Sequence, residues 1–512
     1  MALMKLHVAA PDIARSGAAR LDPRFHYLRR SASPLIDHLK STVRLGLVAT
    51  FSNGLNLPRS AYAEDAEDGA ALYASVAALS SAVLRPSSCI PLKTTGNYVS
   101  GIRIAIEEIA VRPDELLITR SGTPGVAWSG AQVAEDTAVI PSGFIIRGIV
   151  DQEFSVDFVA AILNHPAWRL LTSALASGKR QDNLSQEQLA DVPIPIVDHE
   201  IQRGIAFRFQ EALGQIENLY GNESDFTSIC DEVLSVTLGL CPPLLPRLPV
   251  QVRRVPVGEV AETRTLRIDN RWHGAANLVV RSALREIERT TMRALLEGGP
   301  SKGRQPRWIS EEQADKDTPR GISTATIQSG TISWENAKPT TQESVEAFPV
   351  RRGELLVAMD GDGSLGKAAV YERDSAATVD SHIARCRLIG GPEVADAVSC
   401  YLNSTWGRVQ TTSLMTGATG QTQLNPADLC NIIIPSELIV RASGVSSAYR
   451  TALGEYESLV RKARRIISEA SADLTQQLIR VGAVEQNDRL ASFEDPTYLL
   501  GVFDLLYLQG WR

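Results

Sequence analysis

The feature that most constrains this chain is an internal repeat. Residues 20–26 (RLDPRFH) are matched by residues 267–273 (RIDNRWH). Further matches follow in the same order and at a nearly constant offset: Glu115-Leu116-Leu117 with Glu354-Leu355-Leu356, Leu163-Asn164 with Leu402-Asn403, Gly178 with Gly417, and Gln181, Leu184, Leu189 and Pro195 with Gln421, Leu424, Leu429 and Pro435. The spacing is far too long for a solenoid, so we expect two tandem copies of one domain.

Each copy predicts a mixed α+β fold. Apolar runs at 115–120 and 354–359 end in glycine-rich turns, which is typical of buried strands that enter loops. We expect one helix after each run, followed by a polar loop, a one-turn helix and an apolar strand. The polar loops are residues 178–183 and 417–423, and the final strands are 192–197 and 432–435.

A helical spacer follows each copy. Apolar residues recur at helical spacing over 201–219, stop at 221–224 and resume over 226–240. Over 445–470 they alternate by four and three residues, which predicts a coiled-coil seam. Residues 238–249, rich in proline and leucine, are expected to form a stiff linker. We expect the two spacers to pack antiparallel and to bury Ile205, Phe209, Ile216, Tyr449, Tyr456 and Leu459.

Composition narrows the function classes. The net charge is −7 in 512 residues, which argues against a simple basic DNA-binding domain, although positive charge confined to one face or supplied by a partner would suffice. None of the six cysteines has C-x-x-C spacing, so they are expected to be buried thiols in a reducing compartment. No apolar run is long enough for a membrane span and the first 20 residues do not resemble a signal peptide, so we expect a cytoplasmic protein.

Enzyme signatures are missing from the sequence. It has no G-x-x-x-x-G-K-[ST] phosphate loop and no H-E-x-x-H metal motif. The glycine-rich run 361–366 does not open a helix in a βαβ unit, which argues against a dinucleotide site. Asp114 and Glu115 lack the lysine of a nuclease motif, and residues 495–498 have no cofactor-binding domain around them. We therefore expect no catalytic residue, metal or cofactor in this chain.

The alternation of two repeated domains with two helical spacers resembles the specificity subunit of type I restriction-modification systems. The strings that carry the resemblance are residues 115–122, 184–195 and 199–202, and it extends over about residues 20–480. It implies that each target recognition domain reads one half of a bipartite site in double-stranded DNA. It also implies a pseudo-twofold arrangement in which the spacers fix the gap between half-sites and dock two modification subunits. S-adenosylmethionine and ATP are then expected only on those methyltransferase subunits and on a restriction/translocase subunit.

This resemblance divides the chain into five parts. The first target recognition domain is expected at 1–197 and the second at 249–437. The central spacer and linker take 198–248, the C-terminal spacer takes 438–480, and a tail takes 481–512. The segment that leads into the second spacer, Ser436-Glu437-Leu438-Ile439, lacks the glutamine found at the start of the first.

Candidate DNA contacts lie in the polar loops, because such side chains suit phosphates and base edges. Segment 158–181 holds Arg169, Lys179 and Arg180 without an acidic residue, which predicts a local positive patch. Asp360 is expected at the place of Arg120, so the two copies need not contact DNA alike. The first-copy candidates are Asn53, Arg59, Arg120, Ser121, Gly122, Lys179, Arg180 and Gln181, and the second-copy candidates are Arg304, Arg307, Lys367, His382, Gln421 and Gln423.

Three alternatives stay open at this point. The chain could be a recognition subunit of the same fold in another anti-phage defence complex, which only gene neighbours would reveal. It could be a nuclease or methyltransferase with an unrecognised site, which a metal-dependence or S-adenosylmethionine-binding assay would detect. A coiled-coil adaptor without DNA contact is the least favoured, because two α+β domains with polar loops would then have no role.

Overall fold

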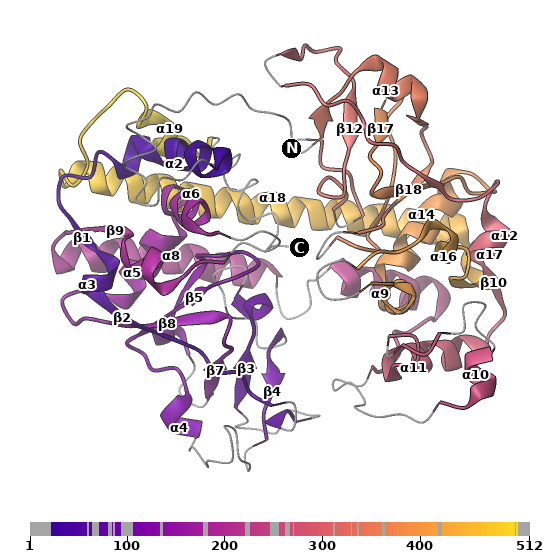
Figure 1. The fold of residues 1–512 in the computed structure, drawn as a ribbon, viewed down its shortest axis with the longest axis horizontal. Helices are drawn as coiled ribbons and strands as arrows, with labels where there is room; N and C mark the ends of the chain where they lie inside the picture. The colour runs from indigo at the N-terminus through magenta and orange to yellow at the C-terminus, as the bar shows by residue number, and fades with distance from the viewer. Residues whose placement is uncertain are drawn as a thin grey trace. The chain divides into compact units, whose positions relative to one another are not determined.

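The computed structural model describes residues 22–58, 61–63, 71–79, 84, 88–93, 106–133, 137–177, 183–220, 226–245, 255–261, 267–269, 271–310, 313–328, 330–334, 337–360, 364–375, 377–417, 422–496 and 498–499. They belong to two compact units, here called unit A and unit B. Unit A contains Lys5–Asn222 and Leu459–Trp511, and unit B contains Glu223–Ser458. Both mix helices with strands (Figure 1), so the chain is α+β.

Unit A is built around small sheets covered by helices. Its strands are β1 (Thr42–Arg44), β2 (Ala49–Asn53), β3 (Leu72–Ala74), β4 (Ile90–Pro91), β5 (Glu115–Thr119), β6 (Ala127–Ser129), β7 (Val139–Pro141), β8 (Ile145–Val150) and β9 (Pro193–Pro195). Its helices are α2 (Pro23–Ile36), α3 (Leu45–Val48), η2 (Val76–Leu79), α4 (Ile106–Ile109), η4 (Gly130–Gln132), α5 (Val156–Asn164), α6 (Pro166–Leu175), α7 (Gln186–Ala190), α8 (His199–Tyr220) and α19 (Ala491–Glu494).

Unit B has its own set of short strands and helices. Its strands are β10 (Arg289–Thr291), β11 (Ser301–Lys302), β12 (Arg320–Ile322), β13 (Lys338–Pro339), β14 (Pro349–Val350), β15 (Leu355–Ala358), β16 (Ala368–Val370), β17 (Ala377–Val379), β18 (Ile383–Cys386) and β19 (Ile433–Pro435). Its helices are α9 (Phe226–Leu238), α10 (Val257–Ala261), α11 (Ala275–Arg285), α12 (Met292–Leu295), α13 (Gln342–Ala347), α14 (Pro392–Asn403), α15 (Thr405–Leu414), α16 (Pro426–Leu429) and α17 (Ser436–Val440).

The strand order of unit A recurs in unit B. Unit A has an antiparallel sheet in the order β2-β8-β5-β6, and unit B has one in the order β11-β18-β15-β16. Each unit also pairs two strands in parallel, β3 with β7 and β12 with β17, and closes a two-stranded ribbon, β1-β9 and β10-β19. The repeated sequence strings therefore correspond to strands with the same neighbours and the same directions.

A buried asparagine explains the repeated Leu-Asn string. At the end of α5, Asn164 accepts from the backbone N–H of Ala127 at 3.0 Å and donates to the carbonyl of Ala127 at 2.7 Å. At the end of α14, Asn403 makes the same two bonds with Ala368, at 3.2 and 2.8 Å. β6 and β16 are the last strands of their sheets. The amide therefore provides hydrogen-bond partners for the backbone N–H and carbonyl that these strands turn away from the sheet, and it fastens the helix to the sheet.

We expect Asn403→Leu to lower the free energy of unfolding of unit B by about 1–3 kcal/mol, because the backbone N–H of Ala368 would stay buried without a partner, while its carbonyl would keep only the 3.3 Å bond from the Ser399 hydroxyl. Urea unfolding monitored by circular dichroism measures the loss. Asn431→Ala, at an exposed position of the same unit, is the matched control and should change little. Equal effects of the two substitutions would contradict a stabilising role for the bonds between Asn403 and Ala368.

The helix expected after each strand run is broken in two. In unit A the break lies at His165, which caps α6 by accepting from the N–H of Ala167 at 3.2 Å. Its Nε2 lies 3.0 Å from Oγ1 of Thr475, in α18 (Ala442–Arg480). The ring is fully buried, and this desolvation lowers the pKa of His165 to about 3.

This histidine makes unit A sensitive to acid. Burial lowers the pKa of the ring from 6.5 in the unfolded chain to about 3 in the folded one. The contribution of the neutral ring to the free energy of unfolding is therefore fully present above pH 6.5 and is lost as pH falls below that value. Between pH 6.5 and 5 we expect a loss of about 2 kcal/mol. His165→Asn, which retains a capping side chain, should flatten this part of the stability–pH curve. If the stability–pH curves of the wild type and of His165→Asn, measured by urea unfolding, run parallel, His165 is not the source of the acid sensitivity.

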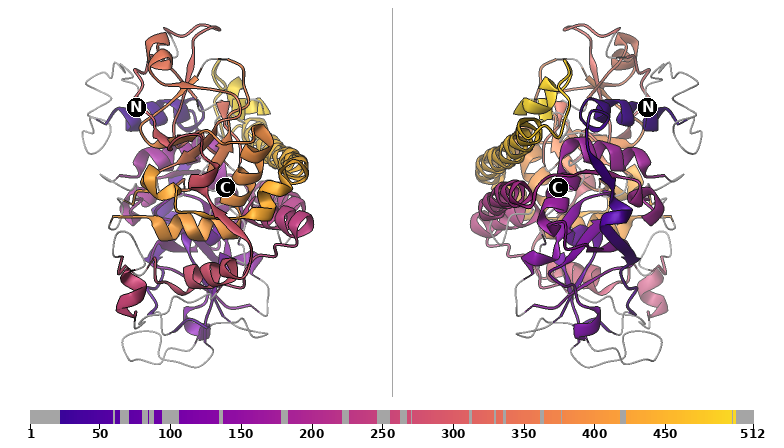
Figure 2. Two further views of the ribbon diagram at one scale, coloured as in Figure 1. Left: turned by 90° about the vertical axis from the view of Figure 1, so that its right-hand side faces the viewer. Right: turned by 90° about the vertical axis from the view of Figure 1, so that its left-hand side faces the viewer.

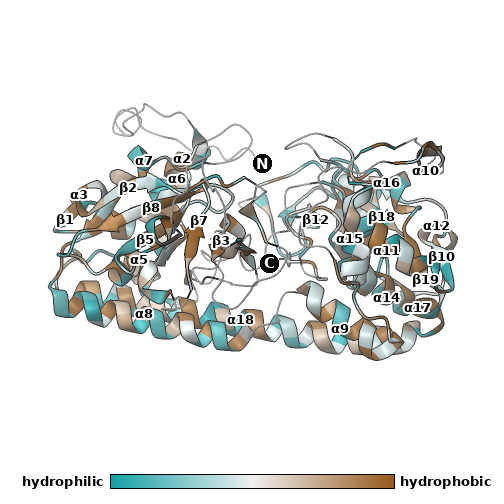
Figure 3. Ribbon diagram, turned by 90° about the horizontal axis from the view of Figure 1, so that it is seen from below, coloured by the Kyte–Doolittle hydropathy of each residue, from teal (hydrophilic) through white to brown (hydrophobic). Residues whose placement is uncertain are grey.

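Amphipathic helices follow each copy of the repeat. The first predicted spacer forms α8 and α9, and the second forms α17 and α18. α18 is one unbroken helix, seen lengthwise in Figure 1 and nearly end-on in Figure 2. Hydrophobic and hydrophilic positions alternate along α8, α9 and α18 (Figure 3), as the apolar spacing of the sequence predicts.

The six residues expected in the helix seam lie on these helices. In unit A, Ile205, Phe209 and Ile216 of α8 are buried in the cluster that also holds Ala463 and Ile467 of α18. In unit B, α9 runs antiparallel to the start of α18, because Phe226 contacts Tyr449 and Tyr456 while the carbonyl of Thr237 accepts from Arg441 at 3.2 Å. Tyr449 and Tyr456 are buried, and Leu459 is half-buried.

Within the described ranges, no helix is long and apolar enough to cross a membrane. The same ranges contain no group of three or more His, Cys, Asp or Glu side chains that could hold a metal ion.

Candidate nucleic-acid interface

Three distant segments of unit B meet at one end of the strands of the β11-β18-β15-β16 sheet. This end of the sheet, where β15 and β11 finish and β18 begins, is called its edge below. After β15, the N–H of Met359 donates to the carbonyl of His382 at 2.8 Å. After β11, the N–H of Gly303 donates to the carbonyl of Ile383 at 2.9 Å. Gln423 joins the same edge through a β-bridge with Asp360. The edge therefore collects predicted contact residues from the turn after β11, the start of β18 and the loop after α15.

Gly303 is required for this close approach. A Cβ atom there would lie 1.9 Å from the carbonyl oxygen of Asp380, so only glycine fits. The next residues, Arg304 and Arg307, are exposed. Among the described residues no carboxylate lies within ion-pair distance of either guanidinium. Both side chains are therefore available for phosphates or base edges.

His382 is oriented by two carboxylates. Its Nδ1 is bonded to Oδ2 of Asp360, and its backbone N–H donates to Oδ1 of Asp380 at 2.9 Å. Burial is the largest influence on Asp380 and raises its pKa. The imidazole itself is half exposed, with 50% of its side chain accessible, so it can both hold Asp360 and face a ligand. Lys367 lies half-buried at the turn before β16, where its N–H donates to the carbonyl of Ser364.

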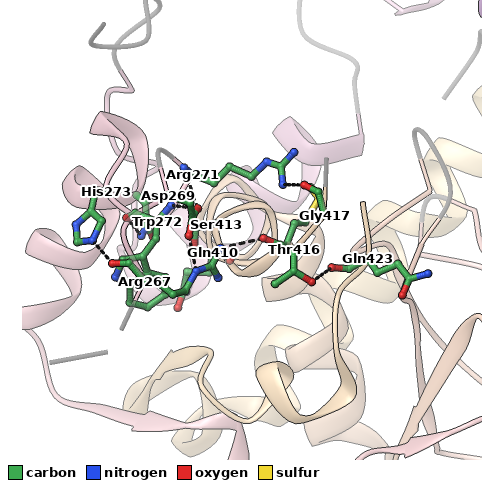
Figure 4. A network of polar contacts seen from close by, with 12 residues as sticks. Arg267, Asp269, Arg271, Trp272, His273, Gln410, Ser413, Thr416, Gly417 and Gln423 are labelled. Atoms are coloured by element: carbon green, nitrogen blue, oxygen red, sulfur yellow. Dashed lines mark hydrogen bonds and ion pairs between the residues drawn. The ribbon is translucent and has the colours of Figure 1, made fainter. Parts of the chain in front are cut away.

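The second copy's polar loop is anchored at both ends, as Figure 4 shows. Thr416 and Gln423 exchange two backbone hydrogen bonds, at 2.8 and 2.9 Å, and the Thr416 hydroxyl donates to the carbonyl of Gln423 at 3.3 Å. Arg267 pairs with Asp269 at 2.6 Å and donates to the carbonyl of Met415 at 2.9 Å, while Arg271 donates to the carbonyl of Gly417 at 3.2 Å. The two arginines are positioning residues that the sequence analysis missed, although they lie in the repeated string 267–273.

Unit A builds the corresponding edge with different side chains. Here the N–H of Arg120 donates to the carbonyl of Phe144 at 3.0 Å, and Ser121 forms a β-bridge with Asn183. Oδ1 of Asn53, at the end of β2, accepts from Nε2 of Gln186 at 3.0 Å. The edge therefore brings together Asn53 and Arg120, two predicted contact residues that are far apart in the sequence.

Some predicted residues are buried, and others cannot be placed. Ser121 is buried, while Gly122 has a φ of 74°, a left-handed conformation that favours glycine at this turn. Five further candidates lie outside the described residues, so their placement stays a prediction: Arg59, Lys179, Arg180, Gln181 and Gln421.

Two expectations about the loops are wrong. Asp360 corresponds to Ser121 and not to Arg120, because Asp360 bridges Gln423 as Ser121 bridges Asn183. Arg169 is not part of an exposed positive patch: it is 1% exposed, and its guanidinium donates to the carbonyl of Pro124 at 2.8 Å. Periodicity could not reveal this burial, because a buried guanidinium that fixes a turn has the same sequence signature as an exposed one.

One exposed aromatic residue at this edge was also missed. Phe144, which precedes β8, is 57% exposed and lines a cavity of about 500 Å³ beside Ser121. A lone phenylalanine after a glycine carries no sequence pattern that would mark it.

The chain is similar to solved type I restriction-modification S subunits. The S subunit from M. genitalium shares 13% identity, with a TM-score of 0.32, over 84% of this chain and 95% of that one. The HsdS subunit from Thermoanaerobacter tengcongensis also shares 13%, with a TM-score of 0.26, over 84% and 96%.

A third solved structure, described as the structural basis of complex assembly and conformational transition of the type I R-M system, shares 13% identity with a TM-score of 0.27, over 84% of this chain and 97% of that one. No family model matches the chain. No curated protein sequence matches it either.

Proposed function

We propose that this chain is the DNA-specificity subunit of a type I restriction-modification system. Each unit is a target recognition domain that reads one half of a bipartite site in double-stranded DNA. The chain carries out no chemistry itself. It directs two modification subunits, which hold S-adenosylmethionine, and an ATP-dependent restriction/translocase subunit to that site.

The observation that supports this proposal best is the repeated sheet edge. In both units the turn after the second sheet strand in chain order, β5 or β15, meets the loop after α6 or α15 through the same β-bridges. In each unit the same turn also donates a backbone hydrogen bond to the residue that precedes β8 or β18. The backbone is the same, but Arg120, Phe144 and Asn183 are replaced by Met359, His382 and Gln423. A protein that reads two different half-sites needs this combination of constant backbone and varied side chains.

The acidic net charge is compatible with this role, because exposed arginines follow β11: Arg304 comes directly after Gly303 at the edge, and Arg307 lies further on, where its N–H donates to Oγ of Ser344 at 3.0 Å. Arg304 and Arg307 are unpaired among the described residues. The carboxylates Asp360 and Asp380 are engaged by His382. Local positive charge can therefore attract phosphates while the rest of the chain stays acidic.

The helices supply the spacer. α18 has 39 residues, of which Ala442–Ser458 belong to unit B and Leu459–Arg480 to unit A. A single helix of this length is stiff, and its rise of about 1.5 Å per residue converts helix length into a fixed distance. We propose that this helix, with α8 and α9, sets the gap between half-sites and docks the modification subunits.

Methylation sequencing of DNA from cells that carry this gene with its neighbours tests the proposal. We expect one bipartite, asymmetric motif with a fixed gap to be methylated, and the motif to disappear when this gene alone is deleted. Methylation that persists after the deletion, or a motif without a gap, would overturn the proposal.

A further inference from the structure

Unit A contains a cavity at the proposed DNA-reading edge that nothing above uses. Its volume of about 500 Å³ lies within the range of small-molecule sites. Its lining combines the aromatic side chains of Tyr62, Tyr73 and Phe144 with the polar residues Asn56, Ser121 and Ser142. The cavity is open to solvent on one side and places flat apolar walls next to hydrogen-bonding groups.

The walls are fixed by backbone and side-chain bonds. The N–H of Gly143 donates to the carbonyl of Leu55 at 3.0 Å, and the N–H of Leu55 donates to the carbonyl of Pro141 at 2.9 Å. Tyr73 donates its hydroxyl to the carbonyl of Leu55 at 2.8 Å. A Cβ atom at Gly143 would lie 2.4 Å from Oδ1 of Asn56, so the glycine allows the amide to sit close to the turn. Such a cavity is preformed and needs little ordering when a ligand enters.

A polar side chain of the lining is open to a ligand. Asn56 is exposed, and its amide offers a carbonyl acceptor and two N–H donors. The rings of Tyr62 and Tyr73, with centroids 5.7 Å apart, add apolar surface for a flat group.

Phe144 lies at the mouth of the cavity, and its exposure distinguishes unit A from unit B. The corresponding residue of unit B, His382, is bonded to Asp360. Phe144 has no such polar partner and remains 57% exposed next to Ser121. Exposed phenylalanines on DNA-binding surfaces act as wedges that enter between base steps and unstack them.

We propose that the cavity of unit A receives one unstacked nucleobase of the bound DNA, while Phe144 fills the gap left in the base stack. The inference rests on the proposed function and adds a mode of reading to it. A nucleobase matches the cavity in flatness and in polar edge atoms, and the Asn56 amide can pair with such an edge. The Asn56 amide and the aromatic contacts would offset the cost of unstacking the base.

The test uses the full chain and a duplex carrying its selected site, in which 2-aminopurine replaces each base of the first half-site in turn. This base analogue is quenched in a stack and brightens when unstacked. We expect its fluorescence to rise severalfold at one position when the chain binds. Phe144→Ala should abolish the rise, and Phe207→Ala, which removes a phenylalanine that is 70% exposed on α8, should preserve it.

A second variant separates the cavity from the wedge. Asn56→Ala should weaken binding to the same duplex by about threefold to tenfold, the value of one hydrogen bond. It should leave the melting temperature of the chain unchanged, because this side chain is exposed. Sequence-specific binding without any fluorescence rise, or a rise that survives Phe144→Ala, would overturn this inference but not the proposed function. Absence of sequence-specific binding would overturn both.

Discussion

Deleting residues 455–461 from α18 is expected to shorten the gap between the two half-sites by about three base pairs and to leave the half-sites themselves unchanged. Seven residues correspond to a rise of about 10 Å along the helix, and successive base pairs are about 3.4 Å apart. One heptad also keeps the apolar seam on nearly the same face, so packing should persist. Binding selection from a random duplex library measures both the gap and the half-sites.

The control for this deletion removes five residues in place of seven. It turns the following helix by about 140°, which carries the apolar face away from its partners and should abolish binding. A seven-residue deletion that still selects the original gap would contradict the proposed role of the helix as a spacer.

Arg304→Ala combined with Arg307→Ala is expected to impair the half-site read by unit B and to spare the other one. If both arginines contact phosphates, affinity should fall equally for all sequences, and the slope of log affinity against log salt should drop by about two. If one reads a base, specificity should relax at one position at a cost of about 1–3 kcal/mol. Competition binding at two salt concentrations separates these outcomes.

Arg352→Ala is the matched control for that pair. Arg352 is exposed, carries the same charge and lies before β15, at the end of that strand opposite Asp360. We expect it to change neither affinity nor salt dependence by a comparable amount. Equal losses in the control and in the double variant would show that only the overall charge matters.

The repeat and the element order could be predicted from the sequence because the repeated strings build the sheets. Glu115 and Glu354 begin β5 and precede β15, where their carboxylates bind Arg147 and Arg387 at 2.6 and 2.9 Å. Asn164 and Asn403 hold the neighbouring strands. Residues held by buried ion pairs or by backbone hydrogen bonds in this way keep their identity in both copies, which makes them visible to simple comparison.

The candidate site was less accessible to sequence reasoning. Arg169 was expected to be exposed, because a charged side chain in a helix is usually solvated, yet it is buried against the turn at Pro124. The correspondence of Asp360 with Ser121 depends on β-bridges that close only in three dimensions. The role proposed for Phe144 depends on the cavity that it lines. Each of these depends on long-range contacts that local patterns do not encode.

Selection of a random duplex library with the purified full chain shows whether both units read DNA. We expect enrichment of two short, different half-sites separated by a gap of constant length and indifferent sequence. Exchanging Arg304 and Arg307 for alanine should then affect only one of them. Enrichment of no sequence, or of one continuous motif without a gap, would contradict the claim that this chain reads DNA through two similar domains.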